Sequence, residues 1–184
     1  MRAEPHRKIR RFVGSPIPSG HGVLWCGPAP MERAESRPMP RQYWLMKSEP
    51  IKYSFAQLVR EKRTMWEGVR NFEARNSMRA MNVGDLVLFY HSSEGKEVVG
   101  VARIAREAYP DPTADGEDWS VVDVEPILPM KEHVSLEVIR SDPDLADVAL
   151  LKRSRLSVVP LSKGHFDRIL QLGKTRLGAA AKAR

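Results

Sequence analysis

The sequence predicts a single α+β domain built on a small, curved, mixed or antiparallel sheet that is barrel-like, with short flanking helices. The chain has 184 residues, which suits one ordinary domain. Short apolar runs typical of strands gather in the middle of the chain, and helix signals lie at the flanks and between them. The elements do not alternate regularly as strand and helix, so a sheet that curves toward a barrel fits better than a doubly wound parallel sheet.

The first predicted element is a strand at 43–46, where four apolar residues precede a turn. Pro50 ends it, because proline donates no ladder hydrogen bond and disfavours helix at the preceding residue. Ser54 and Gln57 have the spacing of a capping box, so a short helix begins there. The side chains expected on its inner face are Phe55, Leu58 and Val59.

Asn71 is a suitable cap for a second helix that extends through Ala80. Strands are then predicted at 85–90, 97–108 and 119–124, with the last two expected to pair in antiparallel fashion. The segment between them is dense in Pro, Asp and Gly, which favours a surface loop.

The prolines at 126 and 129 are expected to end the strand region. Helices are predicted at 135–140 and at 143–151, the second capped by Asp142 with a proline at its first position. A strand at 156–159 follows. Ser162 caps a last helix, which Gly173 closes.

Composition excludes several classes of protein. No apolar stretch approaches the roughly 20 residues needed to span a bilayer, so a membrane protein is not expected. Cys26 is the only cysteine, which excludes an internal disulfide and a C-x-x-C site and indicates a reducing cytoplasm. The five histidines show no ligand spacing. We expect no metal and no cofactor.

Charge divides the chain into three parts. The net charge is +7, yet residues 42–173 hold 18 bases against 20 acids. The excess of positive charge therefore lies in a proline-rich extension at 1–41 and a short tail at 174–184, both predicted to be disordered. Such tails can attract a polyanion without selecting a base. For the extension, translation that begins at Met31 or Met39 is an equal alternative to a functional segment.

Several sequence blocks, in order, resemble those of the EVE family. The resemblance covers about residues 42 to 172 and is far more specific than one short motif. The blocks are Tyr43-Trp-Leu-Met-Lys-Ser-Glu-Pro50, Trp66-Glu-Gly-Val-Arg-Asn-Phe-Glu-Ala-Arg-Asn76, Arg79-Ala-Met81, Gly84-Asp-Leu-Val-Leu-Phe-Tyr-His-Ser92, Arg106-Glu-Ala-Tyr-Pro-Asp111 and Arg155-Leu-Ser-Val-Val-Pro160. It implies a PUA-like fold, related to the YTH readers of methylated adenine in RNA. It also implies recognition of modified bases, mostly in DNA.

A protein that reads a base out of its stack needs an aromatic face and groups that hydrogen-bond to the base edge. Trp66 is the leading candidate for that face. Gly68 would let a flat ring or the backbone approach closely, and the Asn71 amide offers both a donor and an acceptor. The alternative for Trp66 is an ordinary core position.

The ends of two predicted strands carry further candidates for the pocket. Lys47 and Ser48 end the first strand, where the alternative role is to form the turn before Pro50. Tyr90 and Ser92 end another and should share one face by strand alternation, which leaves His91 on the other face as a structural residue. Trp119 is equally a pocket wall or a core residue.

Three arginines are the predicted phosphate contacts: Arg70, Arg75 and Arg79. Arg75 and Arg79 stand four residues apart on one helix face. Phosphate contacts would position a strand without specifying its base. The alternative is a solvated face with local pairing to Glu73.

The sequence therefore favours a non-catalytic reader of a modified nucleobase, with nucleic acid as partner, DNA favoured and RNA possible. Motifs of hydrolases, nucleotide-binding enzymes and base deaminases are absent from the sequence. A catalytic acid pair drawn from Glu49, Glu67 and Asp111 is the main enzymatic alternative. A PUA-like module that binds methylated or structured RNA is the second alternative, and an interaction domain with a vestigial pocket is the third.

Overall fold

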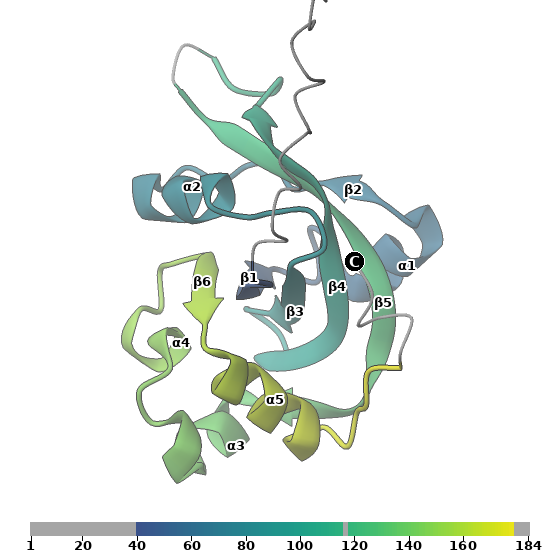
Figure 1. Cartoon of the computed structure of the whole chain (residues 1–184), viewed down its shortest axis with the longest axis vertical. Coiled ribbons are helices and arrows are strands. Elements are labelled where there is room, and N and C mark those ends of the chain that lie inside the picture. The colour runs from purple at the N-terminus through teal and green to yellow at the C-terminus, as the bar shows by residue number, and fades with distance from the viewer. Residues whose placement is uncertain (1–39, 116–117, 179–184) are drawn as a thin grey trace, which may run out of the picture. The chain divides into compact units, whose positions relative to one another are not determined.

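The computed structural model describes residues 40–115 and 118–178. Its centre is one six-stranded sheet with the order β2-β5-β4-β3-β1-β6 (Figure 1). The strands are β1 (Tyr43–Ser48), β2 (Thr64–Met65), β3 (Leu86–His91), β4 (Glu97–Pro110), β5 (Ser120–Ser135) and β6 (Val158–Leu161). The helices are α1 (Phe55–Glu61), α2 (Phe72–Arg79), α3 (Leu136–Ser141), η1 (Pro143–Leu145, a 3₁₀ turn), α4 (Ala149–Lys152) and α5 (Lys163–Leu172).

The sheet is mixed and open. β1 pairs with β3 in parallel, and the remaining neighbours are antiparallel. The long strands β4 and β5 curve strongly, and four register shifts interrupt their pairing (Figure 1). The expected α+β class with a curved mixed sheet is confirmed, but β2 and β6 remain separate edges of the described sheet, so it does not close into a barrel.

β5 runs well past the two prolines that were expected to end it. Pro126 lies opposite Ala102 and Pro129 opposite Gly100, so both stand within the β4 ladder. The β2 strand pairs with β5 only at residues 123 and 124. Beyond that point one side of β5 has no strand partner in the described sheet, and a proline there removes no needed donor.

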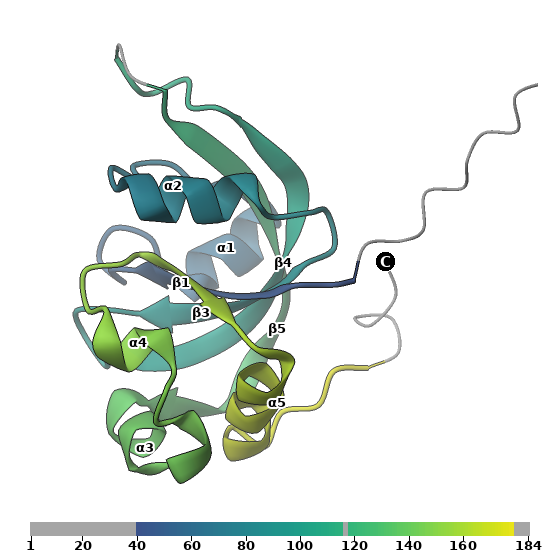
Figure 2. The same cartoon turned by 60° about the vertical axis from the view of Figure 1, so that its left-hand side comes forward.

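The caps predicted at Ser54, Asn71 and Ser162 are confirmed. The side-chain oxygens of these residues, and that of Ser135, each accept a hydrogen bond from the amide three residues later. These bonds satisfy amides that have no partner within the helix. Figure 2 shows α3, α4 and α5 at one end of the molecule, and α1 and α2 toward the other.

Two helix predictions need correction. Val59 is 47% exposed, so α1 buries a narrower stripe than expected. The helix predicted at 143–151 is interrupted between η1 and α4. Leu145, Val148 and Leu150 are all buried, and spacings of three and two residues cannot face one side of a continuous helix. The extended backbone at Val148 resolves that conflict.

An aromatic cluster in the core fixes the position of Trp66. Phe89 on β3 is fully buried. Its ring packs edge-on against Trp66 and against Phe55, with 5.4 Å between ring centroids in each pair. Aromatic pairs in this arrangement contribute about 0.5–1.5 kcal/mol beyond the area that they bury. The indole of Trp66 is thus held in place by its packing against the core.

The ordered part of the domain continues past Gly173, so part of the predicted disordered tail packs on the sheet. Thr175 is buried, and its hydroxyl accepts a hydrogen bond from the Lys131 amide at 2.8 Å. The rest of that tail, 179–184, and residues 1–39 of the predicted extension lie outside the described residues. No helix in the described ranges is long and apolar enough to cross a membrane.

Candidate functional site

A pocket of about 910 Å³ opens where five segments meet. These segments are the end of β1 with its following turn, the helix α1, the stretch from β2 to the start of α2, the residue after β3, and the loop before β6. Its walls are formed by Lys47, Ser48, Glu49, Lys52, Tyr53, Gln57, Glu61, Thr64, Met65, Trp66, Glu67, Gly68, Val69, Arg70, Asn71, Ser92, Ser154, Arg155, Leu156 and Ser157. The volume lies within the range of small-molecule sites.

Trp66 belongs to both the core and the pocket wall. Its exposed fraction is 7%, and its main-chain amide donates to the Val122 carbonyl at 2.8 Å. The indole Nε1 makes no hydrogen bond within the described residues. Trp66 lines the pocket, so its indole provides an aromatic wall whose donor no described residue uses.

Gly68 and Asn71 lie on the same wall. Gly68 has φ of +74°, a left-handed conformation that favours glycine, and a Cβ built there would meet nothing within 4 Å. Backbone geometry, rather than lack of room, therefore selects glycine. Asn71 Oδ1 accepts from the Ala74 amide at 3.0 Å. That cap uses the carbonyl oxygen of Asn71 and leaves its NH₂ group without a partner among the described residues.

Lys47 and Ser48 line the pocket but are tied to neighbouring segments. Ser48 Oγ donates to the Tyr53 carbonyl at 2.7 Å, which fixes the turn into α1. Lys47 Nζ donates to the carbonyls of Arg153 and Ser154, each at 3.1 Å. Burial lowers the pKa of Lys47. Both side chains therefore assemble the pocket walls, whatever contact they make with a ligand.

Ser92 lines the pocket and Tyr90 does not, which corrects their expected grouping. Tyr90 is buried on the opposite face of β3, where burial raises its pKa. Phe89 and His91 instead share the face that supports Trp66. The Ser92 amide donates to the Ser48 carbonyl at 2.9 Å, just beyond the end of β3. That bond brings Ser92 to the pocket independently of strand alternation.

His91 has the structural role expected of it. Its Nε2 accepts from the Phe55 amide at 3.3 Å, which requires a neutral ring nitrogen. Its pKa is lowered, chiefly by burial. The imidazole therefore stabilises the start of α1.

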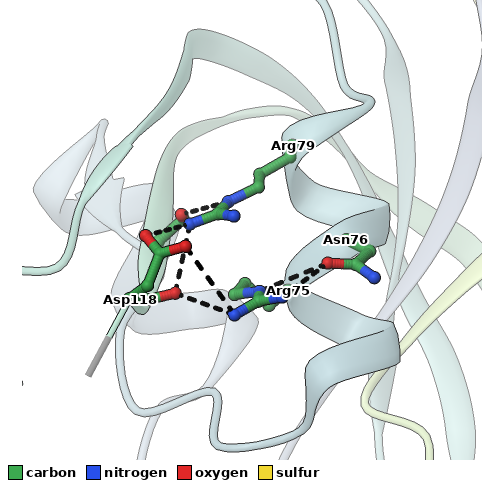
Figure 3. Close-up of polar contacts among 5 residues, drawn as sticks. Arg75, Asn76, Arg79 and Asp118 are labelled. Atoms are coloured by element: carbon green, nitrogen blue, oxygen red, sulfur yellow. Dashed lines mark hydrogen bonds and ion pairs between the residues drawn. The ribbon is translucent and has the colours of Figure 1, made fainter.

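Trp119 and two of the three arginines lie outside the pocket lining. Trp119 stacks on Phe72, with ring centroids 5.0 Å apart and planes 18° apart. Arg75 and Arg79 turn from α2 toward Asp118 (Figure 3). The alternative of local pairing to Glu73 is not found, and Glu73 pairs instead with Arg153.

Arg70 alone of the three arginines lines the pocket. Its Nη1 donates to Asp111 Oδ2 at 2.8 Å. Burial would raise the pKa of Asp111, but hydrogen bonds from Thr113 and Arg70 outweigh that effect and lower it. Asp111 therefore stays ionised and holds the guanidinium at the rim. A guanidinium has five N–H donors, so Arg70 retains donors beyond this bond.

The pocket carries nearly balanced charge. Four bases and three carboxylates line it, and Lys52 pairs with Glu49 at 3.0 Å. Tyr53 donates to Glu61 at 2.7 Å, and burial together with this carboxylate raises the tyrosine pKa to about 12. Glu49 and Glu67, two candidates for an acid pair, both line the pocket, whereas Asp111 is engaged with Arg70. No group of three metal-ligating side chains occurs in the described ranges.

Several wall residues were not found by sequence reasoning. Tyr53, Gln57 and Glu61 come from α1 and the turn before it, and Arg155 and Ser157 come from the loop before β6. Each has an ordinary polar helix or loop context in the sequence, so no local signal marks it. The parallel pairing of β1 with β3 and the antiparallel pairing of β1 with β6 bring these segments together.

The EVE domain model matches residues 42–172, and the chain belongs to this family. The family resemblance expected from the sequence is confirmed.

Individual relatives show the same similarity in sequence and in structure. Mouse thymocyte nuclear protein 1 is 38% identical over 167 residues, which cover 72% of this chain and 74% of the mouse protein. The crystal structure of Atu2648 from Agrobacterium tumefaciens matches with a TM-score of 0.71 and 39% identity, over 73% of this chain and 94% of that one. Human THYN1, solved in complex with DNA that contains 5-methylcytosine, matches with a TM-score of 0.68 and 34% identity, over 74% of this chain and 99% of that one.

Proposed function

We propose that this protein is a reader of a modified nucleobase in DNA, which it holds in the pocket beside Trp66 without changing any covalent bond. The observation that carries the proposal is the indole of Trp66, which lines the pocket beside the Asn71 amide and whose Nε1 makes no hydrogen bond to another described residue. The human relative was solved with DNA that contains 5-methylcytosine. Family membership makes the same class of ligand the first candidate here.

The pocket chemistry suits a single base that has left its stack. An aromatic wall replaces the stacking of neighbouring bases and contributes roughly 1–3 kcal/mol per base. Hydrogen-bonding groups then address the base edge: the Asn71 NH₂ group donates, and the Ser92 hydroxyl both donates and accepts. In a duplex the base must be flipped out, at a cost of a few kcal/mol. We therefore propose base flipping as the mode of entry.

Binding rather than catalysis is supported by how the pocket carboxylates and bases are engaged. Glu49 pairs with Lys52, and Glu61 accepts bonds from Tyr53 and Gln57. Asp111 is ionised and held by Arg70. A general acid or base needs a pKa near the working pH, and the pKa values of Glu61 and Asp111 are both lowered.

The test is a binding screen on the full chain. The ligands are short DNA strands with 5-methylcytosine, N6-methyladenine or no modification, together with matched RNA strands, read by tryptophan fluorescence and anisotropy. A modified DNA strand should quench the fluorescence and bind more tightly than its unmodified and RNA counterparts. Preference for a methylated RNA strand would instead favour the RNA-binding alternative, and equal binding of all strands would contradict a reader.

Asn71→Asp probes the base edge without removing the helix cap. Aspartate caps a helix as well as asparagine does, so α2 should remain folded, while the NH₂ donor is replaced by an acceptor. Selectivity for the modified strand should fall. Gln171→Glu on α5, outside the lining of this pocket, introduces the same change of amide to carboxylate and serves as the matched control.

Mass spectrometry of the recovered DNA tests the absence of chemistry. After prolonged incubation the modified strand should be recovered at its original mass. Any product whose formation depends on Glu49 would favour the enzymatic alternative.

A further inference from the structure

Phe72, the first residue of α2, is unusually exposed for a phenylalanine. Its exposed fraction is 60%, although it is stacked on Trp119, which is buried. Fully burying such a side chain would be worth about 1.5–3 kcal/mol. The protein thus presents an aromatic ring at its surface, supported from below by a second aromatic ring.

The Phe72 ring keeps accessible surface beside a guanidinium. Its exposed fraction is 60%, with Trp119 stacked on it. The Arg75 guanidinium carbon lies 5.0 Å from the Phe72 centroid and 5.9 Å from the Trp119 centroid. The stack is therefore flanked by a guanidinium and remains open to a further partner.

The stack is adjacent to the pocket. Asn71 lines the pocket and directly precedes Phe72, so their Cα atoms are about 3.8 Å apart. Arg70 also lines the pocket, and its guanidinium carbon lies 5.7 Å from the Trp119 centroid. Arg70 thus joins the pocket rim to the rim of the aromatic stack.

We propose that the exposed ring of Phe72 stacks the base next to the modified base on the same DNA strand. This inference rests on the proposed function of the pocket and adds a second subsite to it. Phe72 directly follows Asn71 of the pocket wall, which places the second subsite next to the first.

Charge complementarity favours a nucleic acid strand over an apolar protein partner. Arg70 and Arg75 flank the stack and would face the phosphates on either side of the stacked base. Asp111, Asn76 and the Asp118 carbonyl each accept hydrogen bonds from these two guanidiniums, which hold them in position. A flat ring beside fixed cations matches the alternation of base and phosphate along a strand.

The test compares Phe72→Ala with the wild-type full chain on two ligands. One is a six-nucleotide DNA strand that carries 2-aminopurine beside 5-methylcytosine, and the other is 5-methyl-2′-deoxycytidine monophosphate. Loss of stacking should weaken binding of the strand by about 5- to 140-fold and abolish the quenching of 2-aminopurine. Affinity for the monophosphate should stay unchanged, because it reaches only the pocket.

Two further variants separate stacking from general effects. Phe72→Trp should restore both affinity and quenching, since it restores a flat ring. Val138→Ala on α3, where an exposed apolar side chain lies outside the pocket and the stack, should leave both ligands unaffected.

The outcomes distinguish this inference from the proposed function. If Phe72→Ala binds the strand as the wild type does, the stacking subsite is refuted while the pocket stands. Equal loss of the monophosphate at an unchanged melting temperature would also overturn it, because the ring would then act on the pocket itself. If the wild type binds neither ligand, nor any other modified base, the proposed function fails.

Discussion

Gly100→Ala should destabilise the protein by disturbing the aromatic support of the pocket. A Cβ at Gly100 would lie 2.3 Å from Cζ of the Phe55 ring, with two further ring carbons at 2.4 Å. Ordinary contact begins near 3.4 Å, so the ring would have to move by about 1.1 Å. Phe55 packs on Phe89, which in turn packs on Trp66, so the displacement has no empty space to enter.

The size of the effect follows from two opposing contributions. Overpacking of a filled core costs typically 1–3 kcal/mol. Replacing glycine by alanine restricts the unfolded chain and returns about 0.4–1 kcal/mol. We therefore expect a net loss of about 1–2 kcal/mol in the free energy of unfolding, which lowers the melting temperature by about 2–8 °C. The emission of Trp66 should also change, because its support moves.

Urea denaturation of Gly100→Ala, Phe55→Leu and the double variant measures this effect. Shortening Phe55 should relieve the clash, so the two substitutions should couple by at least about 0.5 kcal/mol. Gly164→Ala on α5 is the matched control, since a Cβ there meets only Ser162 Oγ at an ordinary 3.7 Å. A neutral Gly100→Ala, or strict additivity with Phe55→Leu, would refute the reasoning.

Three further predictions concern polar side chains that hydrogen-bond to the main chain. Asp85→Ala removes a fully buried carboxylate that accepts hydrogen bonds from two main-chain amides and one indole. Each buried group left unsatisfied costs about 1–3 kcal/mol, so urea denaturation should show a loss of at least about 2 kcal/mol in the free energy of unfolding. A smaller loss would contradict this account. The pKa of His91 is lower in the folded protein than its ordinary value of about 6.5 in the unfolded chain. Below pH 6.5 the unfolded chain therefore binds a proton more readily than the folded protein does, so stability falls as the pH falls from 7 toward 5. His91→Gln should flatten this slope in denaturation at the two pH values, whereas an unchanged slope would assign it to other groups. Lys47→Met removes two hydrogen bonds to the loop before β6. Amide hydrogen exchange in that loop should therefore become faster in the variant, while exchange in α5 stays the same. Equal exchange rates in the loop of the variant and the wild type would show that the lysine does not hold the loop.

Features that depend on a few neighbouring residues could be predicted from the sequence. Ser54, Asn71 and Ser162 cap their helices as expected, because each cap bond joins residues only three positions apart. The antiparallel pairing of β4 and β5 also followed from two apolar runs around a turn-rich loop. Trp66 and Asn71 were recognised as neighbours on one wall because they are close in the chain.

Features that depend on distant segments were decided by the fold. Trp66 and Trp119 are both buried tryptophans, yet only the first borders the pocket. Arg75 and Arg79 form ion pairs with Asp118, about 40 residues away in the sequence, rather than with the nearby Glu73. The number of candidate partners for a side chain grows with sequence separation, and sequence pattern does not rank them.

Local sequence patterns are thus enough to predict the elements, the α+β class and the aromatic and amide groups of one wall, because caps and turns are bonds within a short stretch of chain. The folded chain is needed to show which faces of the strands meet, that the sheet stays open, and that Tyr53 and Arg155 complete the pocket. A pocket is the space left when strands that are far apart in the chain pair in one register and pack on one core.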